Sequence, residues 1–127
     1  MDTAALLRAV FFPRDLTRLG RAIIDFAQDY QAELVVPVMV LVEMDLQLRR
    51  RRKIIKQTFQ EFLSAIMEAD YMRIEPLGLD QVRLIPNLLA IPELHDRIIV
   101  AHALTNDAPL MTNDHIIRES GLVETVW

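Results

Sequence analysis

With 127 residues, of which 52% are hydrophobic, the chain is large and apolar enough to fold as one domain over 1–127, which excludes intrinsic disorder. The absence of cysteine excludes disulfide bonds and thiolate-bound zinc, and the net charge of −4 neither indicates nor excludes nucleic-acid binding. No apolar run approaches the roughly 20 residues that span a bilayer and no signal peptide is apparent, so we expect a cytoplasmic protein.

The first half of the chain has the patterns of several helices and one short strand. The predicted elements are helices over 4–11, 18–30, 39–50 and about 53–69, and a strand over 33–36. Pro13 and Pro37 end the first helix and the strand, and Thr17 is the expected N-cap of the second helix. The last of these helices has an apolar face consisting of Ile54, Ile55, Phe59, Phe62, Leu63, Ile66 and Met67.

Strand and helix patterns alternate in the second half. The predicted elements are strands over 71–74, 110–112 and 123–127, and helices over 79–89, 93–105 and 114–120. Pro86 bends or interrupts the first of these helices, and Gly121 closes the last. The alternation predicts an α/β fold with a mostly parallel sheet flanked by helices. Because the chain enters its first helix directly after Met1 and Asp2, the first strand is expected to be short or absent.

Asp2, Glu43, Asp96 and Asp114 stand out among the acidic residues by their positions. Each follows, or lies near, the carboxyl end of a predicted strand or the start of the next helix. The carboxyl ends of parallel strands meet at one edge of a sheet, where α/β folds keep their sites. Carboxylates gathered there repel one another near pH 7 unless a cation is bound. All-oxygen donor sets suit Mg²⁺ or Mn²⁺, so these four residues predict a divalent-metal site.

The four acids belong to four short motifs, which are Asp2-Thr3-Ala4-Ala5-Leu6, residues 37–43 ending on Glu43, residues 96–104 beginning with Asp96, and Leu110-Met111-Thr112-Asn113-Asp114. In this order and at these spacings the motifs resemble those of the PIN domain, a family of metal-dependent ribonucleases. The resemblance covers nearly the whole chain. It departs from the family pattern at Ala4, where the family often has Asn, and in the first strand, of which only Met1 remains.

The resemblance implies a PIN-like fold in which Asp2, Glu43, Asp96 and Asp114 hold one or two Mg²⁺ or Mn²⁺ ions and act as the catalytic residues. It implies hydrolysis of RNA phosphodiesters to 5′-phosphate and 3′-hydroxyl ends. Thr112 and Thr3 would support the acids. Among small single-domain members the commonest role is the toxin of a toxin–antitoxin pair, and the chain is similar to that VapC-type group. An antitoxin partner and a homodimer are therefore expected.

The basic run Arg49-Arg50-Arg51-Arg52-Lys53 and His95 supply candidate RNA contacts. Arg50 lies on the same helix face as Glu43, and Lys53 lies near it, so both are candidates for phosphate binding. His95 is adjacent to Asp96 and is a candidate substrate contact. A solvated helix junction explains the basic run at least as well, and the binding of an acidic partner segment is a third alternative. His102, on the opposite side of the helix, is expected to be structural.

Alternative interpretations remain open at this point. Asp96 and Asp114 can each serve as a helix cap, Glu43 can form a salt bridge with an arginine, and Asp2 can be a solvated terminal acid. At the level of the whole chain, the alternatives are a catalytically inactive PIN-like binding module and a doubly wound ligand-binding or signalling domain whose acids only resemble the nuclease site.

Overall fold

The computed structural model describes residues 1–29, 32–53 and 55–127. Its α-helices are α1 (Thr3–Phe11), α2 (Arg18–Gln28), α3 (Val38–Arg50), α4 (Phe59–Glu68), α5 (Leu79–Leu84), α6 (Leu94–Thr105) and α7 (His115–Ser120). Its strands are β1 (Leu34–Pro37), β2 (Met72–Glu75), β3 (Leu110–Met111) and β4 (Thr125–Val126). Two short 3₁₀ helices are η1 (Pro13–Asp15) and η2 (Ile85–Asn87). No helix in the described ranges has the length and apolar character needed to cross a membrane.

The strands form two parallel pairs, which confirms the predicted α/β class and the parallel arrangement. β1 pairs with β2 from Leu34 opposite Met72 onward, and β3 pairs with β4. Met1 and Asp2 lie between the pairs: the α-amino group of Met1 donates to the Val35 carbonyl at 2.9 Å, and the Asp2 amide donates to the Met111 carbonyl at 3.1 Å. The predicted short first strand is thus represented in the described chain by these two residues, which bridge the pairs.

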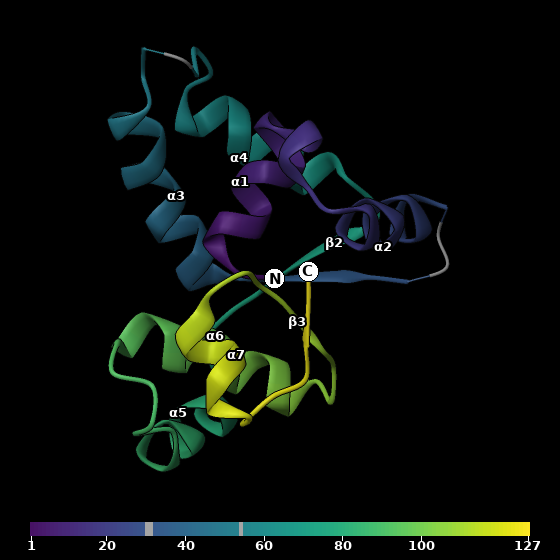
Figure 1. Ribbon diagram of the computed structural model, residues 1–127. Coiled ribbons are helices and arrows are strands. Elements are labelled where there is room, and N and C mark those ends of the chain that lie inside the picture. The colour runs from purple at the N-terminus through teal and green to yellow at the C-terminus, as the bar shows by residue number, and fades with distance from the viewer. Residues whose placement is uncertain (30–31, 54) are drawn as a thin grey trace.

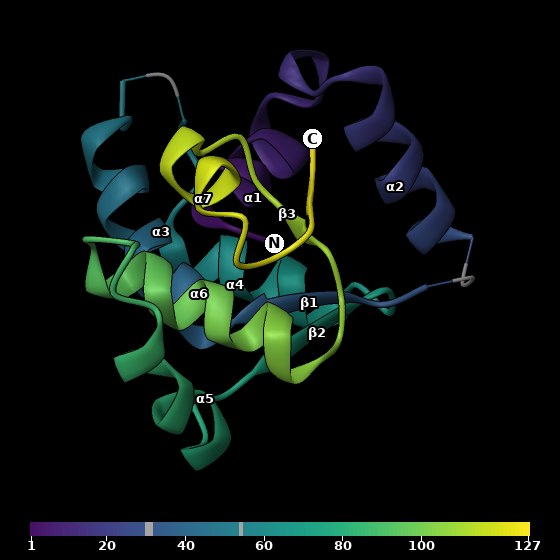
Figure 2. The same ribbon diagram turned by 60° about the horizontal axis from the view of Figure 1, so that its bottom comes forward.

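The helices form layers on both sides of the strands (Figure 1). Helices α1 to α4 lie on one side of β1 and β2, and α5 to α7 lie on the other. Figure 2 shows α6 lying along β1 and β2, where it is central to the molecule. Residues 98–103 of α6 are all buried, which explains why this helix lacks a polar face in its second half.

The core combines side chains from both helical layers. Phe62 of α4 is fully buried and contacts Phe11 of α1, with a distance of 5.9 Å between ring centroids. The largest buried side chains elsewhere in the described chain include Leu6, Met44, Ile91, Ile99, Leu110 and Ile117. A separate, mostly apolar cavity of about 440 Å³ lies beside Met1, between β1 and β3.

The predicted start of α4 is wrong. The helix begins at Phe59 instead of residue 53, because Thr58 and Glu61 form a capping box. The Thr58 hydroxyl accepts from the Glu61 amide at 3.3 Å, and the Glu61 carboxylate accepts from the Thr58 amide at 2.7 Å. Met67, the last residue of the predicted apolar face, is 70% exposed. Ile55 is buried but precedes the helix, and Ile54 lies outside the described residues.

Other boundaries differ from the predictions by a few residues. Helix α5 ends at Leu84 and continues as η2, because Pro86 cannot donate a backbone hydrogen bond. Strand β1 ends at Pro37 as predicted, with Pro37 as its last residue. Gly121 closes α7 as predicted, with a φ of 63° that favours glycine. The predicted end of the second helix, Tyr30, lies outside the described residues. Within the described residues, α2 ends at Gln28.

Candidate active site

The four acids singled out in the sequence line one cavity of about 460 Å³. They reach it from separate elements, since Asp2 precedes α1, Glu43 is in α3, Asp96 is in the first turn of α6, and Asp114 precedes α7. The remaining lining is mixed and consists of Thr3, Ala4, Leu7, Arg8, Leu46, Gln47, Arg50, Arg51, Ile99 and Asn113. Segments that are more than 100 residues apart in the chain therefore share one pocket.

Asp2 is buried and tightly held, so the interpretation of it as a solvated terminal acid is wrong. Asp2 is the N-cap of α1, because its Oδ1 accepts a hydrogen bond from the Ala5 amide at 2.6 Å. Its Oδ2 accepts a short hydrogen bond from the Thr112 hydroxyl. Burial raises the pKa of Asp2, although the hydrogen bonds from Thr112 and Ala5 oppose the rise.

The α-amino group of Met1 adjoins Asp2 in the chain, and its charged form attracts the Asp2 carboxylate. It is buried and donates to the Val35 carbonyl instead of to the carboxylate. Burial lowers the pKa of this amine to about 6, against the opposing influence of Asp2 and Glu75. At neutral pH the amine is therefore mostly uncharged, and it competes only weakly for the Asp2 carboxylate.

Glu43 is held through both of its carboxylate oxygens, but not by an arginine as one interpretation suggested. Oε2 accepts a short hydrogen bond from the Thr3 hydroxyl, and Nδ1 of His95 lies 3.1 Å from Oε1. Thr3 and His95 come from α1 and α6, so they fix Glu43 between two helices. His95 does not line the pocket itself.

Asp96 and Asp114 differ in what holds them. Asp114 is the N-cap of α7, where Oδ1 accepts from the amides of Ile116 at 2.9 Å and Ile117 at 3.1 Å. The Asp114 amide in turn donates to the Thr112 hydroxyl at 2.9 Å. Asp96 is not the cap of its helix, because the N-cap of α6 is Glu93. Burial, and then the charges of Asp114, Glu43 and Asp2, raise the pKa of Asp96 to about 6.

The donor set has the chemistry of a divalent-metal site, because carboxylate and hydroxyl oxygens are the ligands that Mg²⁺ and Mn²⁺ prefer. Burial is the main cause of the raised pKa of Asp96, and the neighbouring acids add to it a repulsion that a cation would relieve. As the side chains stand, no three histidine or acidic groups in the described ranges form a set that could hold a metal ion. Asp2 and Glu43 each accept a hydrogen bond from a threonine hydroxyl, Thr112 and Thr3 respectively.

The predicted RNA contacts are divided between two neighbouring cavities. Arg50 lines the acidic pocket and also a second cavity, which is lined by Arg49, Arg50, Arg52, Lys53 and Lys56. Lys53 lines only the second. Arg8 and Arg51 line the acidic pocket but were not singled out in the sequence. For Arg8 a signal was available, since it is the one charged residue within 3–11, an otherwise apolar helix.

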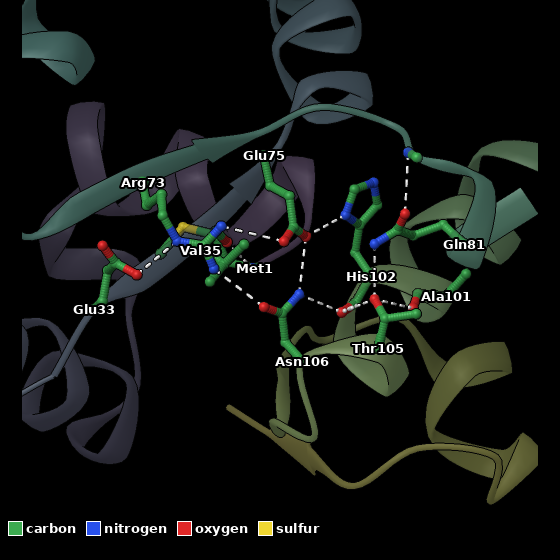
Figure 3. Close-up of polar contacts among 11 residues, drawn as sticks. Met1, Glu33, Val35, Arg73, Glu75, Gln81, Ala101, His102, Thr105 and Asn106 are labelled. Carbon is green, nitrogen blue, oxygen red and sulfur yellow. Dashed lines mark hydrogen bonds and ion pairs between the residues drawn. The ribbon is translucent and has the colours of Figure 1, made fainter.

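His102 has a structural position in a polar cluster between α6 and β2 (Figure 3), and it does not line the acidic pocket. Its Nδ1 is hydrogen-bonded to Glu75 of β2, which also accepts from Asn106 at 2.8 Å and from Arg73 at 3.1 Å. Burial alone would raise the pKa of Glu75, but the hydrogen bonds from His102, Asn106 and Arg73 hold it below its ordinary value. These contacts fasten the C-terminal half of α6, whose first turn carries Asp96, to β2.

The sequence matches a known family. The family model described as the PIN domain matches residues 1–121, a range that includes all four acids and nearly every element of the fold. Among curated proteins, none matches the sequence closely enough to count as a relative. Because the matched model spans almost the entire chain, the chain belongs to the PIN domain family, whose members are generally nucleases.

Proposed function

We propose that this PIN domain is a Mg²⁺- or Mn²⁺-dependent endoribonuclease that hydrolyses RNA phosphodiesters, and that residues 1–127 act as a single domain. The observation that carries the proposal is the convergence of Asp2, Glu43, Asp96 and Asp114 on one pocket of about 460 Å³. Family membership supports the reaction class, because PIN domains are generally nucleases. The donor chemistry and the raised pKa of Asp96 support the metal requirement.

In this proposal the four carboxylates hold the metal, and the threonines orient them. A bound divalent ion supplies neutralisation of phosphate charge and activation of a water molecule as nucleophile. Thr112 joins Asp2 to Asp114 by donating to one and accepting from the other's amide, so it fixes the spacing of two acids. Thr3 donates a hydrogen bond to Glu43 and so fixes the orientation of that carboxylate. The products would carry 5′-phosphate and 3′-hydroxyl ends.

The test is cleavage of single-stranded RNA by the purified protein with Mg²⁺, with Mn²⁺ and with EDTA. Asp96→Asn should lower the cleavage rate by about 100-fold or more, because it removes a charge that the metal needs. Asp80→Asn is the matched control, since Asp80 is an exposed acid on α5. Metal-independent cleavage, or full activity in a folded Asp96→Asn protein, would overturn the proposal.

We further propose that the chain is a cytoplasmic, VapC-type toxin of a toxin–antitoxin pair. Support comes from the order of the four motifs, which is similar to that of the VapC-type group. Expression in bacteria should arrest growth, and co-expression of a neighbouring antitoxin gene should relieve the arrest. Asp96→Asn should abolish the arrest. Growth arrest that persists in this variant would contradict a toxic nuclease activity.

A homodimer is the proposed assembly. Support comes from an exposed apolar stripe on α3 formed by Val38, Val42 and Leu46, which recur at helical spacing. Light scattering should give twice the chain mass for the wild type and the chain mass for Val42→Glu. Met67→Glu, at an exposed apolar position on α4, should remain dimeric. A monomeric wild type would contradict this assembly.

One observation favours a second candidate, a catalytically inactive PIN module that binds RNA or protein. The acidic side chains in the described part of the chain do not form a metal-holding set as they stand. Calorimetric titration with Mn²⁺ separates the two candidates. Heat of binding that disappears in Asp96→Asn supports the nuclease, whereas absence of metal binding together with RNA binding supports the inactive module.

A further inference from the structure

The acidic pocket has a second chemical character, because three arginines line it beside the four acids. Two of the acids, Asp2 and Glu43, lie at or in the same two helices as Arg8 and Arg50. On α1 the lining residues run from Thr3 to Arg8, and on α3 they run from Glu43 to Arg50. Figure 1 shows α1 and α3 rising from the same edge of the strands. At 1.5 Å per residue, Arg8 lies about 7 Å beyond Thr3 along α1, and Arg50 lies about 10 Å beyond Glu43 along α3.

Arg8 is held by an aromatic contact instead of by an acid. Its guanidinium carbon lies 4.8 Å from the centroid of the Trp127 ring. Its Nη1 is buried and, among the residues that the structure describes, has no hydrogen-bond partner. A buried guanidinium N–H without an acceptor is costly, whereas stacking on an indole keeps the edge of the group available for an anion.

Arg50 and Arg51 lie where α3 ends, and they are exposed. The helix dipole favours cations at this end, which accounts for their presence but not for their position in the pocket. Arg49 differs from them, because it forms an ion pair with Asp45 at 2.8 Å. Arg50 also lines the adjoining cavity, whose lining in the described chain is entirely basic. A basic surface therefore continues from the acidic pocket toward Lys53 and Lys56.

We propose that Arg8, Arg50 and Arg51 form a phosphate-binding subsite for single-stranded RNA, which holds a phosphodiester next to the one that is cut. The strand would continue over Arg52, Lys53 and Lys56. The inference rests on the proposed nuclease function for the position of the cut. It adds that recognition depends on a neighbouring phosphate, so that the shortest good substrate has more than one phosphodiester.

The first test measures binding without cleavage. Asp96→Asn protein is titrated calorimetrically with a single-stranded oligoribonucleotide of ten nucleotides at several KCl concentrations in EDTA. Adding Arg8→Gln or Arg50→Gln should weaken binding roughly tenfold at low salt. Each should also reduce the slope of log K against log [KCl] by about 0.7, the value for one phosphate contact on a single strand. Arg83→Gln, on exposed α5, is the matched control and should change neither quantity.

The second test measures cleavage by protein in which Asp96 is intact. Arg8→Gln and Arg51→Gln should raise the KM of the ten-nucleotide substrate and leave kcat nearly unchanged. The rise in KM should be smaller for a dinucleotide, which has only the scissile phosphodiester, and Arg83→Gln should leave the cleavage of both substrates unchanged. Arg8→Lys should restore little of the affinity, because lysine lacks the planar group that stacks on Trp127. Circular dichroism and thermal unfolding identify any variant that fails to fold, and the exposed Arg50 and Arg51 then carry the test.

The outcomes separate the two proposals. Cleavage that depends on Asp96 but not on Arg8, Arg50 or Arg51 overturns the subsite and leaves the nuclease. RNA binding that depends on these arginines without any cleavage supports the subsite and overturns the nuclease. Affinities and salt slopes equal to those of Arg83→Gln overturn the subsite. A preference for an acidic peptide over RNA also overturns it, in favour of a protein partner for the basic run.

Discussion

Thr112 connects two of the four acids of the site. It is fully buried, its hydroxyl donates to Asp2, and the same oxygen accepts from the Asp114 amide at 2.9 Å. A hydroxyl can satisfy both partners because it is at once a donor and an acceptor. Its position two residues before Asp114 was recognised in the sequence, but the bond to Asp2, 110 residues away, was not.

Replacing Thr112 by valine removes this hydroxyl while keeping the branched shape. We expect Thr112→Val to lower the free energy of unfolding by about 1–3 kcal/mol, because Asp2 Oδ2 and the Asp114 amide lose their partner. Urea unfolding in EDTA measures the change. Thr112→Ser keeps the hydroxyl and should retain most of the stability. Equal stability of the valine variant and the wild type would contradict the bridging role.

Asp96 makes the stability of the metal-free protein depend on pH. Its pKa in the folded chain is raised to about 6, above the value of 3.8 expected when the chain unfolds, so the folded state binds the proton more tightly. This contribution favours folding below about pH 4 and is lost as pH rises through about 6. Asp96→Asn should therefore stabilise the protein at pH 7.5 by on the order of 1 kcal/mol, a figure reduced for solvent screening of a partly exposed group.

Denaturant unfolding in EDTA at pH 4.5, 6.0 and 7.5 tests this expectation. The difference between Asp96→Asn and the wild type should grow with pH. Asp80→Asn, at an exposed acid on α5, should show no such trend. A constant difference at every pH would show that the carboxyl group titrates normally.

At the scale of elements, local signals account for most of the predictions that the structure confirms. Thr17 caps α2 by accepting from the Gly20 amide at 3.0 Å, and Gly121 ends α7 in a left-handed conformation. Both effects depend only on residues near in the chain. The start of α4 was missed because the isoleucines at 54 and 55 continue the apolar periodicity. The capping box of Thr58 and Glu61 is a stronger local signal than periodicity, and it was present in the sequence.

Thr58→Ala tests where α4 begins. The substitution removes the acceptor for the Glu61 amide, so we expect the free energy of unfolding to fall by about 1 kcal/mol. Thr58→Ser should be close to the wild type, because serine is an equally good cap. A helix that started at residue 53 would place Thr58 in its interior, and Thr58→Ala would then be neutral or stabilising.

At the scale of the whole molecule, the acids converge because α6 is fixed against β2. Asp96 lies at one end of α6, and His102 and Asn106 at the other end contact Glu75 (Figure 3). The spacing of the acids along the chain was enough to predict that they share a pocket edge, since parallel strands end on the same side. The Glu75 contacts and the stacking of Arg8 on Trp127 could not be predicted, because they join residues far apart in the chain through side-chain packing.

Glu75→Ala should destabilise the protein far more than Glu33→Ala. Glu75 accepts hydrogen bonds from three side chains and is mostly buried, so its loss should cost about 2 kcal/mol. Glu33 pairs with Arg73 at an exposed position, where an ion pair contributes less than about 1 kcal/mol. Urea unfolding of the two variants gives the comparison. Similar losses would mean that α6 is held mainly by its apolar contacts.

Trp127 gives the molecule a built-in optical reporter. It is the single tryptophan of the chain, and its ring lies against the guanidinium of Arg8. Arg8 in turn lines the acidic pocket. An anion that binds this guanidinium changes the electric field at the indole, so its emission should shift in wavelength or intensity. Occupancy of the pocket can therefore be followed in unlabelled protein, and the signal should vanish in Arg8→Gln.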